Sequence, residues 1–187
     1  ALQEYTIGDP NLPKVDIGPI INKNSKDRLM AHISALKKSA RRTIEHHHKQ
    51  NKGDLFITPI VFEIDSINQI DEENFGPILH FIRYKNENLE QVIDEINNTG
   101  YGLTMGVHSR IVSKARRIFE AANVGNFYFN RDIVGAVVGV QPFGGQGLSG
   151  TGPKAGGPGY LYNFVTEKTY TDNVMATGGN IELLNKN

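Results

Sequence analysis

The first third of the chain shows one helical pattern followed by one strand pattern. Apolar side chains recur at intervals of three or four residues, at Leu29, Ile33, Leu36, Ala40 and Ile44. This spacing predicts a helix with one buried face, with Asn24 or Ser25 as the N-cap and an end near Gly53. Residues 56–64 are rich in β-branched and aromatic side chains but include Pro59, which favours an edge strand or the start of a strand.

From residue 78 onward, apolar runs alternate with amphipathic segments. The predicted order is a strand at 78–84, a helix that ends at Gly100, a strand at 103–108, a helix capped by Ser109, and a strand at 126–130. The apolar faces of the two helices are expected at Leu89, Val92, Ile93 and Ile96, and at Ala115, Ile118, Phe119 and Ala122. Nearly continuous apolar strands joined by helices are typical of a parallel sheet covered on both faces. The predicted fold class is therefore α/β, with a parallel β-α-β-α-β core.

Glycine dominates the next segment. Half of the chain's 20 glycines lie between residues 135 and 159, and residues 133–153 contain no charged residue. Such a segment is either a flexible linker or an ordered loop whose backbone forms a site. A linker is expected to be more polar, and this segment has apolar side chains that can pack: Val137, Val138, Val140, Phe143 and Leu148. We therefore predict an ordered loop.

The last regular pattern lies at residues 162–170, where aromatic and β-branched residues alternate with polar ones. This alternation predicts a strand. A strand with an exposed edge favours pairing with another chain.

Charge and hydropathy exclude two classes of function. The 20 basic residues balance 20 acidic ones, and the short basic run at Lys37, Lys38, Arg41 and Arg42 is interpreted as a solvated helix face. The basic surface of a nucleic-acid-binding protein is therefore missing. The longest apolar run, residues 133–140, is far shorter than the roughly 20 residues that span a bilayer, so we expect no membrane insertion.

Cysteine is absent from the chain. Its absence excludes disulfides, thiolate metal sites and a thiol nucleophile within these residues, and it fits a reducing compartment. The first residues, Ala1-Leu2-Gln3-Glu4, include neither an initiator methionine nor a secretory leader pattern. We therefore expect the chain to be cut from a longer protein.

Two motifs suggest ligand sites but lack the surroundings that such sites need. Residues 145–150 satisfy G-x-G-x-x-G, but the glycines and prolines of residues 151–159 are poor material for the helix that a Rossmann fingerprint requires. His46, His47 and His48 would point about 100° apart on a helix and cannot converge on one metal ion. We interpret them as a polar helix end. The other histidines are interpreted as isolated structural or exposed residues, namely His32, His80 and His108, so no metal site is predicted.

Short motifs in a fixed order resemble the aldehyde dehydrogenase superfamily. Glu72-Glu73-Asn74-Phe75-Gly76-Pro77 is similar to its E-x-F-G-P motif. Further landmarks match in order: Gly18-Pro19-Ile20, Tyr101-Gly102-Leu103-Thr104, Gly125-Asn126 with Asn130, and Pro142-Phe143-Gly144-Gly145. Residues 133–158 look like the Δ1-pyrroline-5-carboxylate dehydrogenase branch, and together with residues 176–180 they resemble the dehydrogenase module of the bifunctional proline utilization A family. The resemblance covers nearly the whole chain.

The resemblance implies NAD-dependent oxidation of glutamate γ-semialdehyde to glutamate in proline breakdown. In that family a cysteine thiolate attacks the aldehyde, hydride passes to the nicotinamide, and a glutamate-activated water hydrolyses the thioester. Both groups and the cofactor domain are expected upstream of Ala1. No catalytic residue is therefore expected in this chain, which alone is expected to be inactive. FAD is expected only in an absent proline dehydrogenase module.

Five residues take ligand-binding roles by this resemblance. Glu73 corresponds to the glutamate that binds the nicotinamide ribose, and Phe75 to the aromatic residue beside the nicotinamide ring. Gly135 and Ala136 correspond to a loop whose backbone N–H groups anchor the substrate α-carboxylate. Phe143 corresponds to an aromatic residue that packs on the aliphatic part of the substrate. NAD and glutamate γ-semialdehyde are thus the expected ligands of the whole protein.

The resemblance also implies a domain division and a location. Residues 1–164 would form most of the catalytic domain, and residues 165–187 an oligomerisation strand with a tail, which implies a homo-oligomer. The whole protein is expected in the cytoplasm, with peripheral contact to the inner membrane through its flavin module. Two alternatives stay open. One is a non-catalytic assembly module that keeps the fold, which the missing nucleophile favours; the other is an aldehyde dehydrogenase for another substrate.

Overall fold

The structure is a computed structural model that describes residues 1–47, 53–150 and 152–173. It divides into two compact units, which are considered separately. The first comprises Ala1–Thr99 and Glu120–Ala122, and the second comprises Gly100–Phe119 and Asn123–Asn187. The domain boundary expected at residue 165 stays a prediction.

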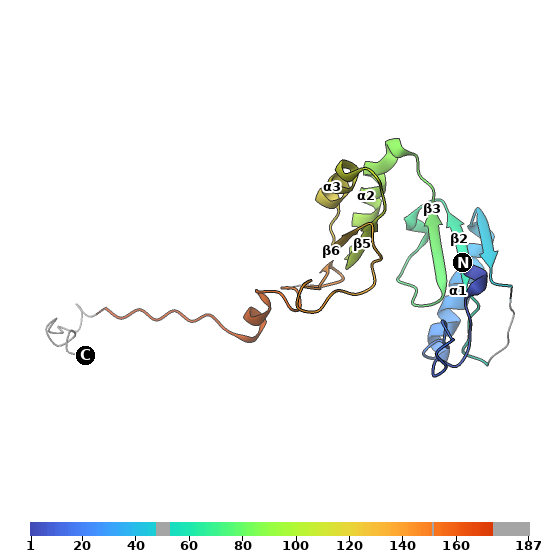
Figure 1. The fold of residues 1–187 in the computed structure, drawn as a ribbon, viewed down its shortest axis with the longest axis horizontal. Helices are drawn as coiled ribbons and strands as arrows, with labels where there is room; N and C mark the ends of the chain where they lie inside the picture. Colours follow the sequence, from blue (N-terminus) through green and yellow to red (C-terminus); the bar gives the residue numbers. More distant parts are fainter. Residues whose placement is uncertain (48–52, 151, 174–187) are drawn as a thin grey trace. The chain divides into compact units, whose positions relative to one another are not determined.

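The first unit consists of a helix packed on a three-stranded sheet (Figure 1). Helix α1 (Lys23–Ser39) precedes strands β1 (Arg42–Glu45), β2 (Ile60–Ile64) and β3 (Ile78–Ile82). β2 lies in the middle, antiparallel to β1 and parallel to β3. The core between α1 and the sheet contains Ile20, Leu29, Ile33, Leu36, Ile57, Ile60, Phe62 and Ile64.

The first helix is shorter than its apolar spacing predicts. Asn22 is the N-cap, because its side-chain oxygen accepts a hydrogen bond from the backbone N–H of Ser25 at 2.8 Å. The helix ends at Ser39, since Ala40 has an extended backbone with ψ of 144°. Ile44, which the spacing assigned to the helix, lies in β1 opposite Val61. β-sheet pairing therefore overrides the helical periodicity beyond Ala40.

The histidine run is not a polar helix end. His46 follows β1, its backbone N–H donates to the carbonyl of Pro59 at 3.1 Å, and it is buried. His47 is exposed after the same strand, and His48 lies outside the described residues. Pro59 directly precedes β2, as a strand start predicts, but the edge position is wrong because β2 is the central strand.

The second half of the chain follows the predicted order of elements. Helix α2 (Leu89–Asn98) belongs to the first unit, together with short 3-10 helices at Leu2–Glu4, Ile67–Gln69 and Asn86–Asn88. The second unit contains β4 (Tyr101–Gly102), β5 (Thr104–Val107), most of α3 (Val112–Ala121), β6 (Asn126–Phe129) and β7 (Gln146–Gly147). Ala115 and Ile118 are buried on α3 as predicted, whereas Phe119 is 56% exposed and contacts Phe127 edge to face.

The α/β fold class is confirmed, and two parallel strand pairs are present. β5 and β6 are parallel with α3 between them in the sequence, and β2 and β3 are parallel in the first unit. β3 pairs with β2, so the predicted β-α-β-α-β series is distributed over separate hydrogen-bonded sheets. The two-residue strands β4 and β7 form an antiparallel pair that ties the glycine-rich loop back to Gly102.

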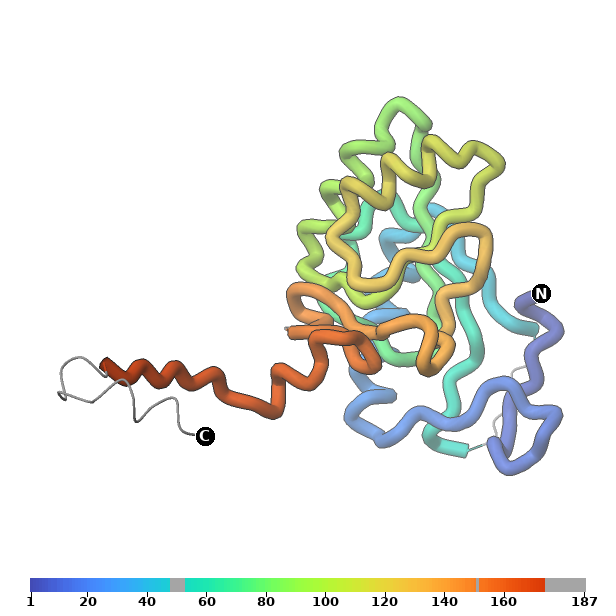
Figure 2. The backbone as a smooth tube through the Cα atoms, turned by 60° about the vertical axis from the view of Figure 1, so that its left-hand side comes forward, coloured from blue at the N-terminus to red at the C-terminus, as the bar shows by residue number. Residues whose placement is uncertain are grey.

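The C-terminal part of the described chain has little internal packing. Tyr160–Phe164 form the 3-10 helix η4 and residues 165–170 form no strand, so the prediction of a strand over residues 162–170 is wrong. Residues 165–173 run extended and exposed, without a strand partner among the described residues (Figure 2). Within the described residues, none of the helices has the length and apolar character that crossing a membrane requires.

Candidate active-site surfaces

One cavity in the first unit brings two predicted site residues together. It has a volume of about 620 Å³, and Glu73 and Phe75 both line it. Residues 16–21 and the start of α1 form the rest of its lining. Two motifs separated by about fifty residues, Gly18-Pro19-Ile20 and residues 72–77, thus line one cavity.

The first turns of α1 and a close backbone approach shape this cavity. The Asn22 cap starts the helix so that Ser25 and Arg28 reach the cavity. A Cβ atom on Gly76 would lie only 2.7 Å from Cδ1 of Leu29, so the absence of a side chain lets residues 72–77 approach the helix closely. Backbone hydrogen bonds from Ile60 to Pro77 and from Ile78 to Gly76 then fix this segment to the sheet.

The charges in the cavity favour a ligand with hydroxyl donors. Glu72 pairs with Arg28 at 3.7 Å, whereas the carboxylate of Glu73 has no hydrogen bond or ion pair among the described residues. Asp16 adds a third carboxylate, which accepts a hydrogen bond from the backbone N–H of Thr6. Three carboxylates against one guanidinium suit a sugar better than a phosphate, because carboxylate oxygens only accept hydrogen bonds.

In the second unit, a buried asparagine fixes the loop that carries Phe143. Asn126 on β6 is 8% exposed, and its side-chain amide donates to the carbonyl of Pro142 at 3.0 Å. The amide oxygen accepts from the backbone N–H of Gly144 at 3.1 Å. Phe143 itself exchanges two backbone hydrogen bonds with Ala155, each 3.0 Å long. The loop is therefore ordered at this point, as predicted.

Next to Asn126, two backbone segments approach each other even more closely than residues 72–77 approach helix α1. A Cβ atom on Gly125 would be 1.8 Å from the carbonyl oxygen of Gly144, so the two backbone segments touch. The Lys154 ammonium donates to the carbonyl of Gly125 from the other side. β6 and the loop thus meet backbone to backbone.

Gly135 and Ala136 present two adjacent backbone N–H groups without a partner among the described residues. On either side, the N–H of Val134 donates to Asp132 at 3.1 Å and the N–H of Val137 donates to Gln141 at 3.0 Å. Gly135 has φ of +65°, a conformation that glycine adopts without strain. The loop therefore offers two neighbouring donors to a ligand.

An ion pair lies close to these donors, between the Arg131 guanidinium and the Asp132 carboxylate at 3.8 Å. The guanidinium of Arg131 contacts the Gln141 side-chain oxygen at 3.4 Å, which is the same oxygen that accepts from Val137. It also lies over the ring of Tyr128, with 4.6 Å from Cζ to the ring centroid. The Tyr128 hydroxyl in turn donates to the carbonyl of Gly135 at 2.8 Å. Two N–H donors beside a guanidinium form a surface suited to an anion.

A comparison with known protein families identifies the family of the chain. The model of the aldehyde dehydrogenase family matches residues 1–170. The chain belongs to this family.

Relatives in the aldehyde dehydrogenase family are much longer than the chain. It is 44% identical to the bifunctional protein PutA of Klebsiella aerogenes over 90% of the chain and 13% of that protein. It is 38% identical to a 1-pyrroline-5-carboxylate dehydrogenase of Geobacillus sp. (strain WCH70) over 91% of the chain and 33% of that protein. A crystal structure of a Bradyrhizobium japonicum proline utilization A variant matches with a TM-score of 0.82 and 51% identity, covering 94% of the chain and 18% of that protein.

Within this aldehyde dehydrogenase framework, the five predicted site residues fall into two groups. Glu73 and Phe75 line the cavity of the first unit, with Phe75 79% exposed. Gly135, Ala136 and Phe143 lie in the glycine-rich loop of the second unit. Their ligand-binding roles stay predictions.

The Rossmann interpretation of residues 145–150 is correctly excluded. Gln146–Gly147 form β7, and residues 152–159 after it contain turns and no helix. A dinucleotide fingerprint needs a helix N-terminus at that place to hold the pyrophosphate. The described residues also contain no group of three metal-ligating side chains.

The buried polar residues that hold the loop were not predicted from the sequence. Asn126 and Tyr128 lie two residues apart on β6 and are both buried, so they share one face of the strand. A buried asparagine on an otherwise apolar strand must find hydrogen-bond partners. This rule could have identified Asn126 from the sequence. Applying it requires knowing that the residue is buried, and the pattern of a four-residue strand does not show this.

Two histidines predicted to stand alone are in fact partners. Nε2 of His32 on α1 and Nε2 of His80 on β3 lie 2.8 Å apart, and the His80 ring stacks near Phe62. Burial lowers the pKa of His32, which Asp71 and Glu72 partly oppose. Burial also lowers the pKa of His80, and the neighbouring His32 lowers it further. The pair therefore favours neutral imidazoles, one donating to the other.

Proposed function

We propose that the protein containing this chain is an NAD-dependent dehydrogenase that oxidises glutamate γ-semialdehyde to glutamate in proline catabolism. The observation that carries this proposal is the pair of N–H groups of Gly135 and Ala136, which have no partner among the described residues and lie beside Arg131. The chain spans 13% of the bifunctional relative and 33% of the monofunctional one, so the activity is that of a larger protein.

The glycine-rich loop would select the substrate by its α-carboxylate. The N–H groups of Gly135 and Ala136 would donate to the carboxylate oxygens, and the guanidinium of Arg131, which Asp132 partly balances at 3.8 Å, would lie beside them. Phe143, held by the Asn126 clamp, would pack on the aliphatic carbons of the substrate. Simple aldehydes lack the carboxylate and would bind less tightly.

The cavity of the first unit fits the nicotinamide ribose of NAD. The carboxylate of Glu73, which has no partner among the described residues, can accept from two ribose hydroxyls, and the exposed ring of Phe75 can limit the tilt of a flat nicotinamide. The acidic lining supports a contact with sugar rather than with pyrophosphate. When bound, NAD⁺ accepts the hydride of the aldehyde.

The covalent chemistry would come from residues outside this chain. In the proposed reaction a cysteine thiolate attacks the aldehyde carbon, hydride leaves, and a water activated by a glutamate hydrolyses the thioester. Aldehyde, NAD⁺ and water thus become acid, NADH and a proton. Because the chain contains no cysteine, its own residues only bind and orient the reactants.

The substrate proposal is tested on the full-length protein with a panel of aldehydes. We expect kcat/KM for glutamate γ-semialdehyde to exceed that for propanal and butanal, which have no α-carboxylate. Equal values would favour an aldehyde dehydrogenase of another specificity. A lack of NAD⁺ reduction with any aldehyde would favour the non-catalytic assembly module.

The cofactor proposal is tested by Glu73→Ala. Because hydrogen bonds to a charged group are worth about 1.5–3 kcal/mol, we expect KM for NAD⁺ to rise roughly 10- to 100-fold. Glu73→Gln keeps one acceptor and should fall between. Glu87→Ala, at an exposed carboxylate that pairs with Lys85 at 3.6 Å, is the control. Wild-type NAD⁺ kinetics in Glu73→Ala would refute the assignment.

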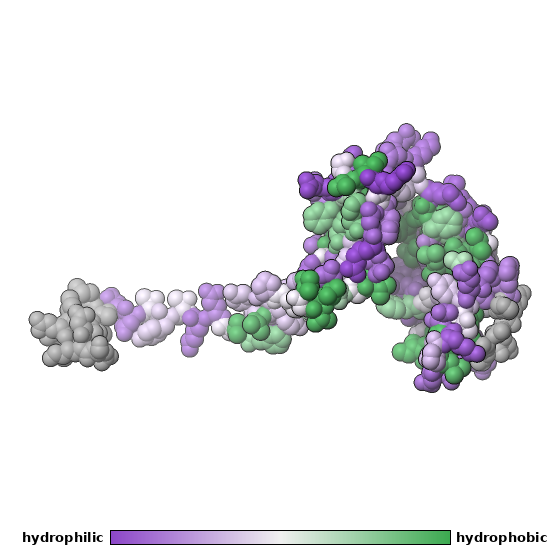
Figure 3. Space-filling model, viewed as in Figure 1, coloured by the Kyte–Doolittle hydropathy of each residue, from purple (hydrophilic) through white to green (hydrophobic). Residues whose placement is uncertain are grey.

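We also propose that the C-terminal segment of the described chain contacts a second copy of the protein. Apolar side chains are exposed on and after η4, including Leu161, Tyr162, Phe164 and Val165 (Figure 3). Leu161→Asp combined with Phe164→Asp should lower the molar mass measured by light scattering. An unchanged mass would contradict the contact. A cytoplasmic location, with peripheral membrane contact through an FAD-containing proline dehydrogenase module, stays part of the proposal.

A further inference from the structure

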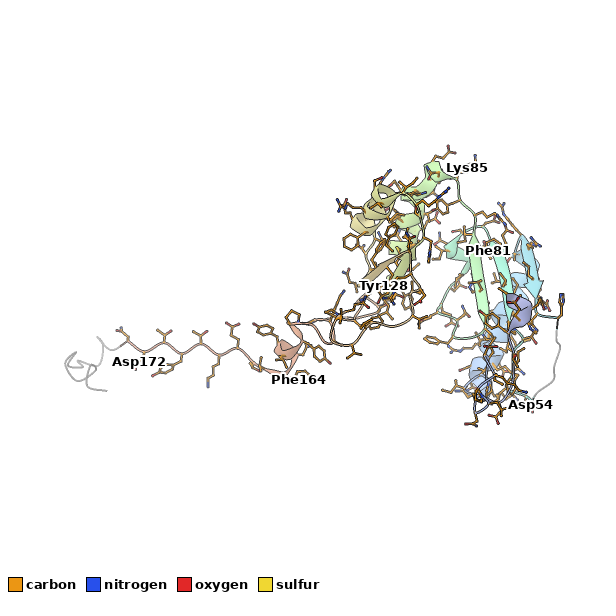
Figure 4. All side chains as sticks on the ribbon, in the orientation of Figure 1. Asp54, Phe81, Lys85, Tyr128, Phe164 and Asp172 are labelled. Carbon is orange, nitrogen blue, oxygen red and sulfur yellow. The ribbon has the colours of Figure 1, made fainter. Side chains whose placement is uncertain are left out.

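Tyr128 connects the buried face of β6 to the exposed loop at Gly135. The side chain is 5% exposed, and its hydroxyl donates to the carbonyl oxygen of Gly135 at 2.8 Å (Figure 4 labels Tyr128). The Arg131 guanidinium covers the ring from the loop side. A buried ring holds the hydroxyl in one place, so the carbonyl is held as well.

The bound carbonyl determines where the next N–H points. A trans peptide is planar, and its C=O and N–H groups point in opposite directions. The carbonyl of Gly135 and the N–H of Ala136 belong to one such peptide. Because the carbonyl points to the Tyr128 hydroxyl, the N–H of Ala136 points away from it.

This peptide needs an external anchor. Gly135 is exposed, has φ of +65°, and a Cβ atom there would meet nothing within 4 Å. Neither steric contact nor a backbone hydrogen bond of Ala136 fixes the orientation among the described residues. A glycine peptide in open space can rotate at low cost. The hydrogen bond from Tyr128 selects one orientation.

We propose that Tyr128 is a positioning residue that aims the N–H of Ala136 at the substrate carboxylate. The proposal rests on the function proposed above, and deepens it by naming a buried residue that determines specificity without touching the substrate. The neighbouring donors of Val134 and Val137 are already engaged by Asp132 and Gln141. The direction of the remaining two N–H groups, those of Gly135 and Ala136, therefore determines how well the loop binds an anion.

Tyr128→Phe in the full-length protein tests this role, because it removes only the hydroxyl and keeps the ring beneath Arg131. We expect KM for glutamate γ-semialdehyde to rise roughly 3- to 10-fold, the effect of one lost neutral hydrogen bond. The kcat, the KM for NAD⁺ and the kinetics with propanal should stay within about two-fold of wild type. Tyr84→Phe, at a half-exposed tyrosine of the first unit, is the matched control.

A second measurement tests carboxylate binding at this loop without requiring catalysis. Glutarate carries a carboxylate but no aldehyde, and its inhibition constant in Tyr128→Phe should rise by the same factor as KM. The thermal midpoint of each variant is measured in parallel, so that a folding defect is recognised.

Two results would overturn the role of Tyr128. One is an unchanged KM and glutarate constant in Tyr128→Phe; the other is an equal loss with semialdehyde and propanal, which indicates a purely structural effect. In both cases wild-type turnover of the semialdehyde leaves the proposed function standing. If the wild-type protein does not turn over the semialdehyde, the proposed function fails, and this role fails with it.

Discussion

Replacing Asn126 by alanine is expected to loosen the loop around Phe143. The change removes two hydrogen bonds, to Pro142 at 3.0 Å and from Gly144 at 3.1 Å. Each neutral hydrogen bond contributes about 1 kcal/mol, and each backbone group left without a partner at a half-buried position adds up to about 1 kcal/mol. The expected loss is therefore about 2–4 kcal/mol in the free energy of local opening.

Hydrogen exchange in the full-length protein measures this loss directly. The backbone N–H groups of Phe143 and Gly144 are both hydrogen-bonded, to Ala155 and to Asn126. A loss of about 2–4 kcal/mol corresponds to roughly 30- to 1,000-fold faster exchange of a peptide covering residues 142–145.

The control is Asn11→Ala, which removes an exposed side-chain hydrogen bond to Asp9 of 2.9 Å. It should leave exchange at residues 142–145 unchanged. If Asn126→Ala also leaves that exchange unchanged, the clamp does not hold the loop, and the argument for the placement of Phe143 is wrong.

Two further predictions concern packing and protonation. Gly125→Ala would place a Cβ atom 1.8 Å from the Gly144 carbonyl oxygen, so we expect a fall in thermal midpoint equivalent to more than about 3 kcal/mol, whereas Gly159→Ala, with its nearest atom at 3.5 Å, should be close to neutral. The His32–His80 pair has folded-state pKa values below the ordinary 6.5, so its stabilisation is fully present above about pH 6.5 and is lost as the pH falls through the folded values. We therefore expect hydrogen exchange of the α1 amides, corrected for the pH dependence of the intrinsic exchange rate, to become faster as the pH is lowered from about 7.5 to 5.5. In His80→Gln this increase should be smaller.

Each of these predictions has a result that contradicts it. A Gly125→Ala protein as stable as wild type would show that the two backbone segments can separate without cost. Equal pH dependence of α1 exchange in wild type and His80→Gln would show that other groups cause the loss of stability.

Local sequence patterns predicted the elements in which apolar residues recur at one regular interval. The apolar residues of α2 and α3 recur every three or four positions, and Gly100, with φ of +75°, ends the α2 region as a left-handed residue. The same spacing continued past Ala40 to Ile44, although Ile44 pairs with Val61 in β1. Pairing between distant residues is a long-range effect, so local periodicity did not reveal where α1 ends.

Site residues could be predicted from the sequence only where they belong to a short motif of the family. Glu73 and Phe75 were identified by motif, and the structure places both on one cavity. Asn126 and Tyr128 act through partners 7 to 18 residues away in the loop, at Pro142, Gly144 and Gly135. No local pattern encodes such partners, because a hydrogen bond between a strand and a loop depends on the fold of both.

The central claim is that the loop at Gly135 and Ala136 binds the substrate carboxylate. The most direct measurement is a crystal structure of the full-length protein with its product, glutamate, bound. We predict that oxygens of the glutamate α-carboxylate lie about 2.7–3.2 Å from the backbone nitrogens of Gly135 and Ala136. An α-carboxylate bound elsewhere, with both nitrogens facing water, would contradict the claim.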